Sequence, residues 1–180
     1  MSKIEIVATG VGFLGLIPFL LSFQLKKRNN IILANLISRI LFILQYILLG
    51  AFAGAAYDFI GLLSSIVARR KHKGFVAKYQ TAIIIIINAL LVAAGIMLYK
   101  NIYSILGLAG IIFEVAALWM TKERDIRIVS FISAPFWMIF NLASKAYASV
   151  PGNILAMVSI GIAFIRLDIP KKEKSGGNEC

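Results

Sequence analysis

Seven long apolar blocks divide the chain, and short polar or basic segments separate them. A helix needs about 20 apolar residues to cross the hydrocarbon core of a bilayer, where it satisfies its own backbone groups. Nothing in the blocks alternates between polar and apolar with a period of two, so the pattern indicates helices and not strands. It predicts an all-α membrane protein with seven transmembrane helices, near residues 4–24, 31–49, 53–68, 79–99, 102–120, 126–147 and 150–167.

The composition agrees with this prediction. Of the 180 residues, 60% are hydrophobic and only 15% are charged, which is too little polar sequence to cover a soluble domain. The net charge of +11 comes from cations in short runs between apolar blocks, which argues against a nucleic-acid surface. We expect no metal, no cofactor and no catalytic residues, because no ligand cluster and no paired nucleophile and base can be found. The expected partners are the lipid bilayer and an unknown small polar solute, and the chain is either a monomer or a homo-oligomer.

Basic residues favour one set of helix ends. The helix ends with few basic residues carry only Lys3, Lys100 and Lys145. The positive-inside rule places the helix ends with many basic residues in the cytoplasm. The N-terminus is then outside and the C-terminus in the cytoplasm. The ends with many basic residues carry Lys26, Lys27, Arg28, Arg69, Arg70, Lys71, Lys73, Lys78, Lys122, Arg124, Arg127, Arg166, Lys171, Lys172 and Lys174.

The first and last three blocks match without gaps when the chain is shifted by about 95 residues. A unit of three spanning helices begins on one side of the membrane and ends on the other. Two such units in direct succession would therefore be inverted relative to each other, and one extra helix between them makes them parallel. The sequence therefore predicts two parallel three-helix bundles, 1–73 and 101–168, joined by a linker transmembrane helix within 74–100 and followed by a cytoplasmic tail, 169–180. Parallel repeats occur among secondary transporters, which bind substrate between the repeats. The aligned pairs include Gly12 with Gly107, Gly15 with Gly110, Lys27 with Lys122, Ser38 with Ser133, Phe42 with Trp137, Ala51 with Ala146, Phe52 with Tyr147, Asp58 with Asn153 and Ser64 with Ser159.

Two segments, Phe-Gln-Leu-Lys-Lys at 23–27 and Leu-Phe-Ile-Leu-Gln-Tyr-Ile-Leu-Leu-Gly at 41–50, carry a family likeness. The chain resembles the bacterial YgjV inner-membrane family over nearly its whole length. Its plan is similar to that of the SWEET, SemiSWEET and PQ-loop carriers, although Phe23 stands where the Pro of the Pro-Gln pair is expected. The resemblance implies a multi-pass protein of the bacterial cytoplasmic (inner) membrane.

The likeness to SWEET-type carriers also implies a binding site, formed by an aromatic residue on the second helix of each bundle and an amide on the third. Carried over, these positions are Phe42 with Asp58 and Trp137 with Asn153, and Asp58 departs from the expected Asn. An indole face stacks on rings and an amide both donates and accepts hydrogen bonds, as a sugar-like solute requires. The repeat-related residues Tyr46 and Asn141, one turn further on, are expected to line the same cavity.

Three charged residues lie well inside the apolar blocks, more than two residues from either end: Arg39, Asp58 and Glu114. Arg39 and Glu114 lie at similar depth, about 9–12 Å from the cytoplasmic face at 1.5 Å per residue, and are predicted to pair as an inner gate. The alternative is that Arg39 reaches the headgroups while Glu114 is protonated or wetted. Asp58 lies about two turns below the outer surface. It is either a proton-coupling or substrate-binding group or an interfacial residue wetted by the outer vestibule.

These features predict a small-polar-solute (sugar-like) transporter that works by alternating access between the two bundles. The alternatives are a non-transporting membrane receptor or assembly protein on the same fold, and a vitamin-precursor carrier similar to the PnuC group.

Overall fold

A computed structural model describes residues 3–168, so the predicted tail at 169–180 lies outside the described residues. Within that range the chain is helical and contains no strand. Six helices are long and apolar enough to cross a membrane, if α8 is counted with the π-helix that continues it, and α3 is a shorter apolar helix of 17 residues. The elements are α1 (Lys3–Gln24), α2 (Arg28–Leu48), α3 (Phe52–Ala68), α4 (Gly74–Lys78), α5 (Gln80–Met97), α6 (Ile102–Trp119), α7 (Glu123–Ala143), α8 (Ser149–Ala163) and the π-helix Phe164–Asp168.

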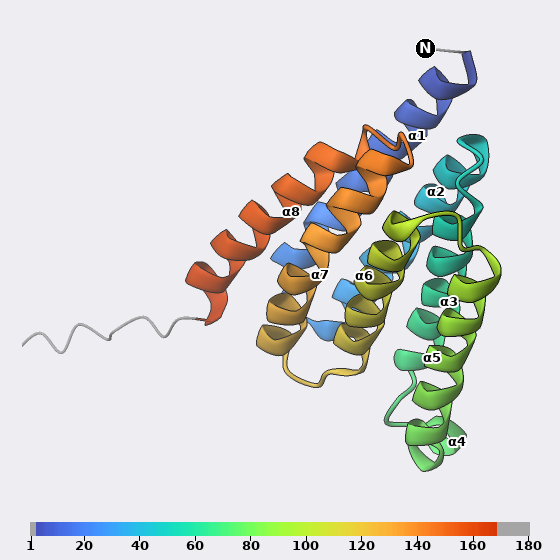
Figure 1. The fold of residues 1–180 in the computed structure, drawn as a ribbon. Helices are drawn as coiled ribbons and strands as arrows, with labels where there is room; N and C mark the ends of the chain where they lie inside the picture. The colour runs from blue at the N-terminus through green and yellow to red at the C-terminus, as the bar shows by residue number, and fades with distance from the viewer. Residues whose placement is uncertain (1–2, 169–180) are drawn as a thin grey trace, which may run out of the picture.

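The connections between helices alternate between two ends of the molecule (Figure 1). The connection from α6 to α7 and the short helix α4 lie at the bottom of the view, where α1 and α3 also end. We call this the basic end, because its connections carry the cation runs. The start of α1 and the connection from α7 to α8 lie at the opposite end.

Six helices form a closed ring. Along the ring α1 packs on α2, α2 on α3, α3 on α6, α6 on α7, α7 on α8, and α8 returns to α1. The segments α1–α3 and α6–α8 therefore meet along two seams, between α1 and α8 and between α3 and α6. Helix α5 lies outside the ring against α3 and α6. Its buried residues Ile87, Leu91 and Gly95 recur every four positions, so it packs through one narrow stripe.

Segments 95 residues apart have the same local structure. The N–H of Ile31 donates to the Lys27 carbonyl at 3.1 Å, and the corresponding bond from Ile126 to Lys122 is 3.2 Å long. After α2 and α7 the chain turns through a left-handed residue at matching positions, Gly50 with φ 66° and Lys145 with φ 60°. The repeat found in the sequence is thus also a repeat of backbone conformation.

Two glycines at matching positions allow close packing inside the two halves. A Cβ added to Gly12 in α1 would lie 2.5 Å from Nε2 of Gln45 in α2. A Cβ added to Gly107 in α6 would lie 2.8 Å from a ring carbon of Phe140 in α7. Gln45 and Phe140 are themselves 95 residues apart, so each half repeats one helix contact with a different partner.

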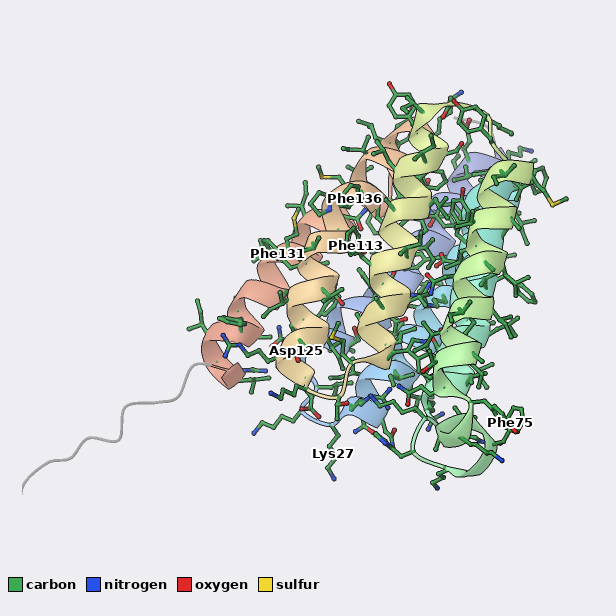
Figure 2. The ribbon with its side chains drawn as sticks, turned by 60° about the horizontal axis from the view of Figure 1, so that its bottom comes forward. Lys27, Phe75, Phe113, Asp125, Phe131 and Phe136 are labelled. Atoms are coloured by element: carbon green, nitrogen blue, oxygen red, sulfur yellow. The ribbon has the colours of Figure 1, made fainter. Side chains whose placement is uncertain are left out.

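The outer surface of the helices is apolar. Figure 2 shows Phe113, Phe131 and Phe136 on the sides of α6 and α7, whereas Lys27 projects from the basic end. Phe113 and Phe136 stack with ring centres 5.7 Å apart. Such apolar surface on the sides, with exposed charge near the ends, is what a bilayer requires of a spanning bundle.

The helix bounds differ from the predicted blocks most clearly at α2, α4 and α7. Helix α7 runs from Glu123 to Ala143, whereas the predicted block was 126–147. Helix α4 was not predicted, because its five residues are too short to register in a search for apolar blocks, and Phe75 within it is 71% exposed. Helix α2 begins at Arg28, three residues before the predicted start, because the search for apolar blocks left the polar segment 28–30 out.

Candidate functional site

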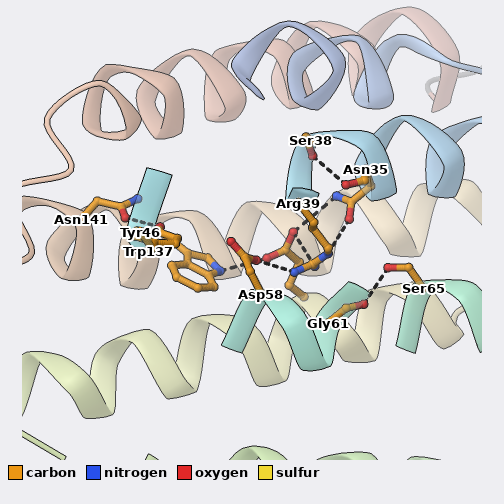
Figure 3. A network of polar contacts seen from close by, with 10 residues as sticks. Asn35, Ser38, Arg39, Tyr46, Asp58, Gly61, Ser65, Trp137 and Asn141 are labelled. Carbon is orange, nitrogen blue, oxygen red and sulfur yellow. Dashed lines mark hydrogen bonds and ion pairs between the residues drawn. The ribbon is translucent and has the colours of Figure 1, made fainter. Parts of the chain in front are cut away.

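The centre of the ring contains a buried cation. Arg39 lies in α2 and is only 1% exposed. Its Nε donates to Oδ1 of Asn35, one turn earlier on the same helix, at 2.9 Å. Its Nη1 donates to Oδ1 of Asp58 in α3 at 2.7 Å, as Figure 3 shows. The neighbouring helix therefore supplies the first counter-charge.

The second counter-charge comes from the other half of the chain. Oε1 of Glu114 in α6 lies 2.9 Å from Nη2 of Arg39, as an ion pair without the alignment of a hydrogen bond. Oε2 of Glu114 accepts from Nε1 of Trp137 at 2.9 Å. One guanidinium thus lies between two carboxylates, and we call this group the Asp58–Arg39–Glu114 triad.

An aromatic cluster adjoins the triad. Tyr46 and Trp137 stack with ring centres 6.3 Å apart and planes 17° from parallel. Phe140 meets both rings edge-on, at 6.1 and 5.7 Å. The Tyr46 hydroxyl donates to Oδ1 of Asn141 at 2.5 Å. Tyr46 and Asn141 are repeat-related, so their contact marks the axis that relates the two halves.

Two matching glycines bring the cavity aromatics close to their neighbours. A Cβ on Gly15 would lie 3.0 Å from the ring of Phe42, and one on Gly110 would lie 3.1 Å from the indole of Trp137. In both halves, an aromatic side chain of the second helix therefore packs closely on a glycine of the first helix, at the same repeat position.

A cavity lies between these groups. The centre of a water molecule can occupy about 30 Å³ of it. This is room for about two water molecules. Asn153 reaches it from α8 and is 6% exposed, and its Nδ2 has no hydrogen-bond partner within residues 3–168. All six ring helices contribute to the lining, which consists of Leu16, Phe19, Ser38, Arg39, Phe42, Tyr46, Asp58, Glu114, Trp137, Asn141, Ser149 and Asn153.

A family model for bacterial inner membrane proteins, the YgjV family, matches residues 6–171. The chain belongs to the YgjV family. Neither a curated protein nor a solved structure matches it at a significant level. The YgjV resemblance predicted from the sequence is confirmed, and with it a multi-pass protein of the bacterial inner membrane. The likeness to SWEET-type carriers stays a prediction.

All eight side chains predicted for the site of this YgjV-family chain line the one cavity, although their roles stay predictions. Arg39 and Glu114 are in contact, as predicted. The contact between Asp58 and Arg39 was not predicted, because the sequence analysis counted their depths from opposite faces of the membrane, yet Asp58 binds Arg39 directly. Counted from the start of α2 at Arg28, Arg39 lies about 16 Å from the basic end at 1.5 Å per residue, deeper than predicted and level with Asp58.

Sequence reasoning missed a second set of contacts in the YgjV-family chain, at the basic end. The guanidinium of Arg28 donates to the carbonyls of Leu118 at 2.5 Å and Met120 at 3.1 Å. Arg127 donates to the carbonyls of Phe23 at 3.3 Å and Leu25 at 3.2 Å. Leu118 and Met120 are the repeat partners of Phe23 and Leu25. Each half therefore contributes an arginine that caps the last turn of the other half's first helix, where carbonyls lack helical partners.

Lys71 strengthens one of these caps. Its ammonium donates to the carbonyls of Trp119 and Met120, both at 2.8 Å, and the side chain is 2% exposed. Burial, and then the charge of Arg28, lower the pKa of Lys71. We call Arg28, Lys71 and Arg127 the basic-end clamps. The sequence signal was a cation near a helix C-terminus, but the sequence analysis used these residues only as topology signals.

The opposite end is closed differently in this YgjV-family chain. A hollow of about 280 Å³ lies among the connections there and is lined by Lys100, Asn101, Lys145 and Phe140, among others. Phe140 also contacts Tyr46 and Trp137, which line the central cavity. Phe140 thus lines the hollow on one side and contacts two aromatic residues of the cavity on the other.

Proposed function

We propose that this chain is a carrier for a small polar solute and works by alternating access between α1–α3 and α6–α8. The observation that carries the proposal is the central cavity, which all six ring helices line and most of whose lining residues are buried. A carrier site must lie between two units that move against each other, and it must be reachable from one side at a time.

The proposal includes a topology of seven spans in a three-plus-one-plus-three plan, with α5 as the linker. The N-terminus lies outside and the C-terminus in the cytoplasm. Support comes from the alternation of connections between two ends and from the cations at one of them. Helix α3 spans about 26 Å at 1.5 Å per residue, near the lower limit for crossing, and tilt or local thinning of the bilayer accommodates such a length.

The seams between the halves suggest how the cavity opens. Opening toward the basic end requires the clamps to release and Glu114 to leave Arg39, whereas Asp58 stays with Arg39 because both belong to the first half. Glu114 is therefore the moving partner of the gate, and Asp58 keeps the guanidinium compensated while the gate is open. Opening toward the other end requires the layer of Tyr46, Trp137 and Phe140 to part. The hydrogen bonds from Tyr46 to Asn141 and from Ser149 to Gln45, which join the two halves, must break as well.

A second candidate is a receptor or assembly protein that moves no solute. The small cavity favours this candidate, since it has room for about two water molecules, and so does the internal pairing of the triad charges. The two candidates differ in whether the cavity ever opens.

Thiol accessibility tests whether the cavity opens. In a Cys180→Ser background, Asn153→Cys is expected to react with a membrane-impermeant thiol reagent added to either side of oriented proteoliposomes. Ile162→Cys is a matched control on the same helix, since Ile162 is 53% exposed on the apolar surface, and it should resist the reagent. An Asn153→Cys protein that stays unreactive from both sides, although correctly inserted, contradicts the carrier.

Counterflow of labelled solutes into liposomes that contain the purified protein tests transport itself. The panel contains sugars, amino sugars, nucleosides and small amines. We expect saturable exchange of at least one class, reduced at least tenfold in both Asn153→Ala and Trp137→Ala. Exchange that is unaffected by both variants would place the solute path elsewhere.

A further inference from the structure

The charges in the cavity do not balance. The triad contains one cation and two carboxylates, and the remaining lining residues carry no charge. A net negative charge at mid-membrane is costly unless a positive partner or a proton compensates it. We propose that the cavity binds a small solute that carries a protonated amine and an oxygen acceptor. This inference rests on the proposed carrier function and names its substrate class.

The carboxylate oxygens show where an ammonium group would bind. Both oxygens of Glu114 have partners, Arg39 and Trp137. Oδ1 of Asp58 accepts from Arg39, whereas no hydrogen bond joins Oδ2 to another residue in the described range 3–168. Asp58 lines the cavity, so Oδ2 is the acceptor that an ammonium would take.

The second anchor is an amide. Nδ2 of Asn153 is buried without a partner, which costs free energy until a ligand supplies an acceptor. Asp58 and Asn153 occupy matching repeat positions on α3 and α8, on either side of the axis marked by Tyr46 and Asn141. A solute between them presents its amine to one half and its oxygen to the other.

The aromatic walls fit the same ligand. Ring faces attract cations, and Trp137 and Tyr46 adjoin the triad while Phe42 lines the same cavity. An anionic solute would face an uncompensated carboxylate, and a neutral solute of equal size would leave Oδ2 unpaired. The cavity must widen to admit any such ligand, as alternating access requires.

Matched pairs of solutes test the substrate class. The probes are glucosamine with glucose, and ethanolamine with ethylene glycol, because each pair differs mainly in the amine. The first readout is thermal stabilisation of the full-length protein in detergent, and the second is counterflow in proteoliposomes. We expect the amine of at least one pair to need a concentration at least tenfold lower than its neutral partner for half-maximal stabilisation, and to exchange at least tenfold faster.

Two variants locate the preference at Asp58. Asp58→Asn should reduce the ratio of amine to neutral response at least tenfold, whereas Asp58→Glu should retain a preference for the amine. Asp125→Asn removes a carboxylate at the basic end (Figure 2), in the first turn of α7 and 12 residues before the cavity residue Trp137, and should leave the ratio unchanged. A folded Asp58→Glu protein that still prefers the amine also shows that the position tolerates substitution, so that the test does not depend on Asp58→Asn alone.

The outcomes separate the two proposals. Neutral solutes that match the amines in both readouts would overturn the inference and leave the carrier intact, with a proton then balancing the triad. An unchanged ratio in folded Asp58→Asn would overturn it as well. Stabilisation by amines without any counterflow would support the inference and contradict the carrier.

Discussion

The two halves of the ring share a backbone but not a chemistry. Helix starts, left-handed turns and glycine contacts recur 95 residues apart, yet the positions that face the centre diverge. Arg39 corresponds to Ala134, and Glu114 corresponds to Phe19. The triad therefore has no counterpart across the axis, although the helices that carry it do.

This difference shows which positions determine the scaffold and which determine the chemistry of the site. Glycines recur at matching positions where helices approach, because a larger side chain would disturb packing, and the left-handed turn recurs where the chain reverses, although its residue changes from Gly50 to Lys145. Charges differ where they face the cavity, so a ligand there meets two unlike walls. A symmetric frame with unlike walls favours one orientation of the bound solute.

The largest expected effect comes from removing Arg39, whose repeat partner in the second half is the uncharged Ala134. Arg39→Met should destabilise the protein by about 3–5 kcal/mol, because it leaves two buried carboxylates without their partner. The measurement is thermal or denaturant unfolding in detergent. The triple variant Arg39→Met, Asp58→Asn, Glu114→Gln should recover most of the loss. A triple variant no more stable than Arg39→Met would mean that the charges are not the cause.

A smaller effect should distinguish the two matched glycines. Gly107→Ala should cost about 1–3 kcal/mol, because its methyl group meets the rigid ring of Phe140. Gly12→Ala meets only the end of the flexible Gln45 side chain, and the higher helix propensity of Ala offsets part of the strain, so it should cost less than about 1 kcal/mol. Unfolding of both variants side by side checks the order. Gly10→Ala is the control, since no atom lies within 4 Å of its added Cβ.

The smallest effect should come from the matched turns and should have opposite signs. Gly50→Ala should destabilise by about 1 kcal/mol, because L-residues are strained at positive φ. Lys145→Gly relieves that strain and should stabilise by less than about 1 kcal/mol, since Gly also gains freedom in the unfolded chain. The same unfolding measurement applies, and equal signs for the two changes would contradict the equivalence of the turns.

The helices were largely predictable from sequence, because hydropathy alone separates spans from connections in a membrane protein. Helix α4 was missed since a five-residue helix leaves no hydropathy signal. The repeat was also readable, because glycines and connection charges kept one register through both halves.

The site was predictable in its members more than in its contacts. The likeness to SWEET-type carriers implied Trp137 and Asn153, and the cost of burying a charge in the bilayer drew attention to Arg39. The contact between Asp58 and Arg39 was missed, because it depends on where α2 begins and on the reach of a long side chain. The basic-end clamps were missed for a similar reason, since a lysine in a basic run gives no sign in the sequence that it will be buried.

The division of the triad between the halves has a consequence for biosynthesis. Ribosomes make the chain from the N-terminus, so Arg39 and Asp58 emerge within 19 residues of each other, and Glu114 follows 56 residues after Asp58. The translocon therefore receives a first unit whose two intramembrane charges already cancel. The surplus negative charge enters the bilayer only with α6, when the second half arrives to enclose it.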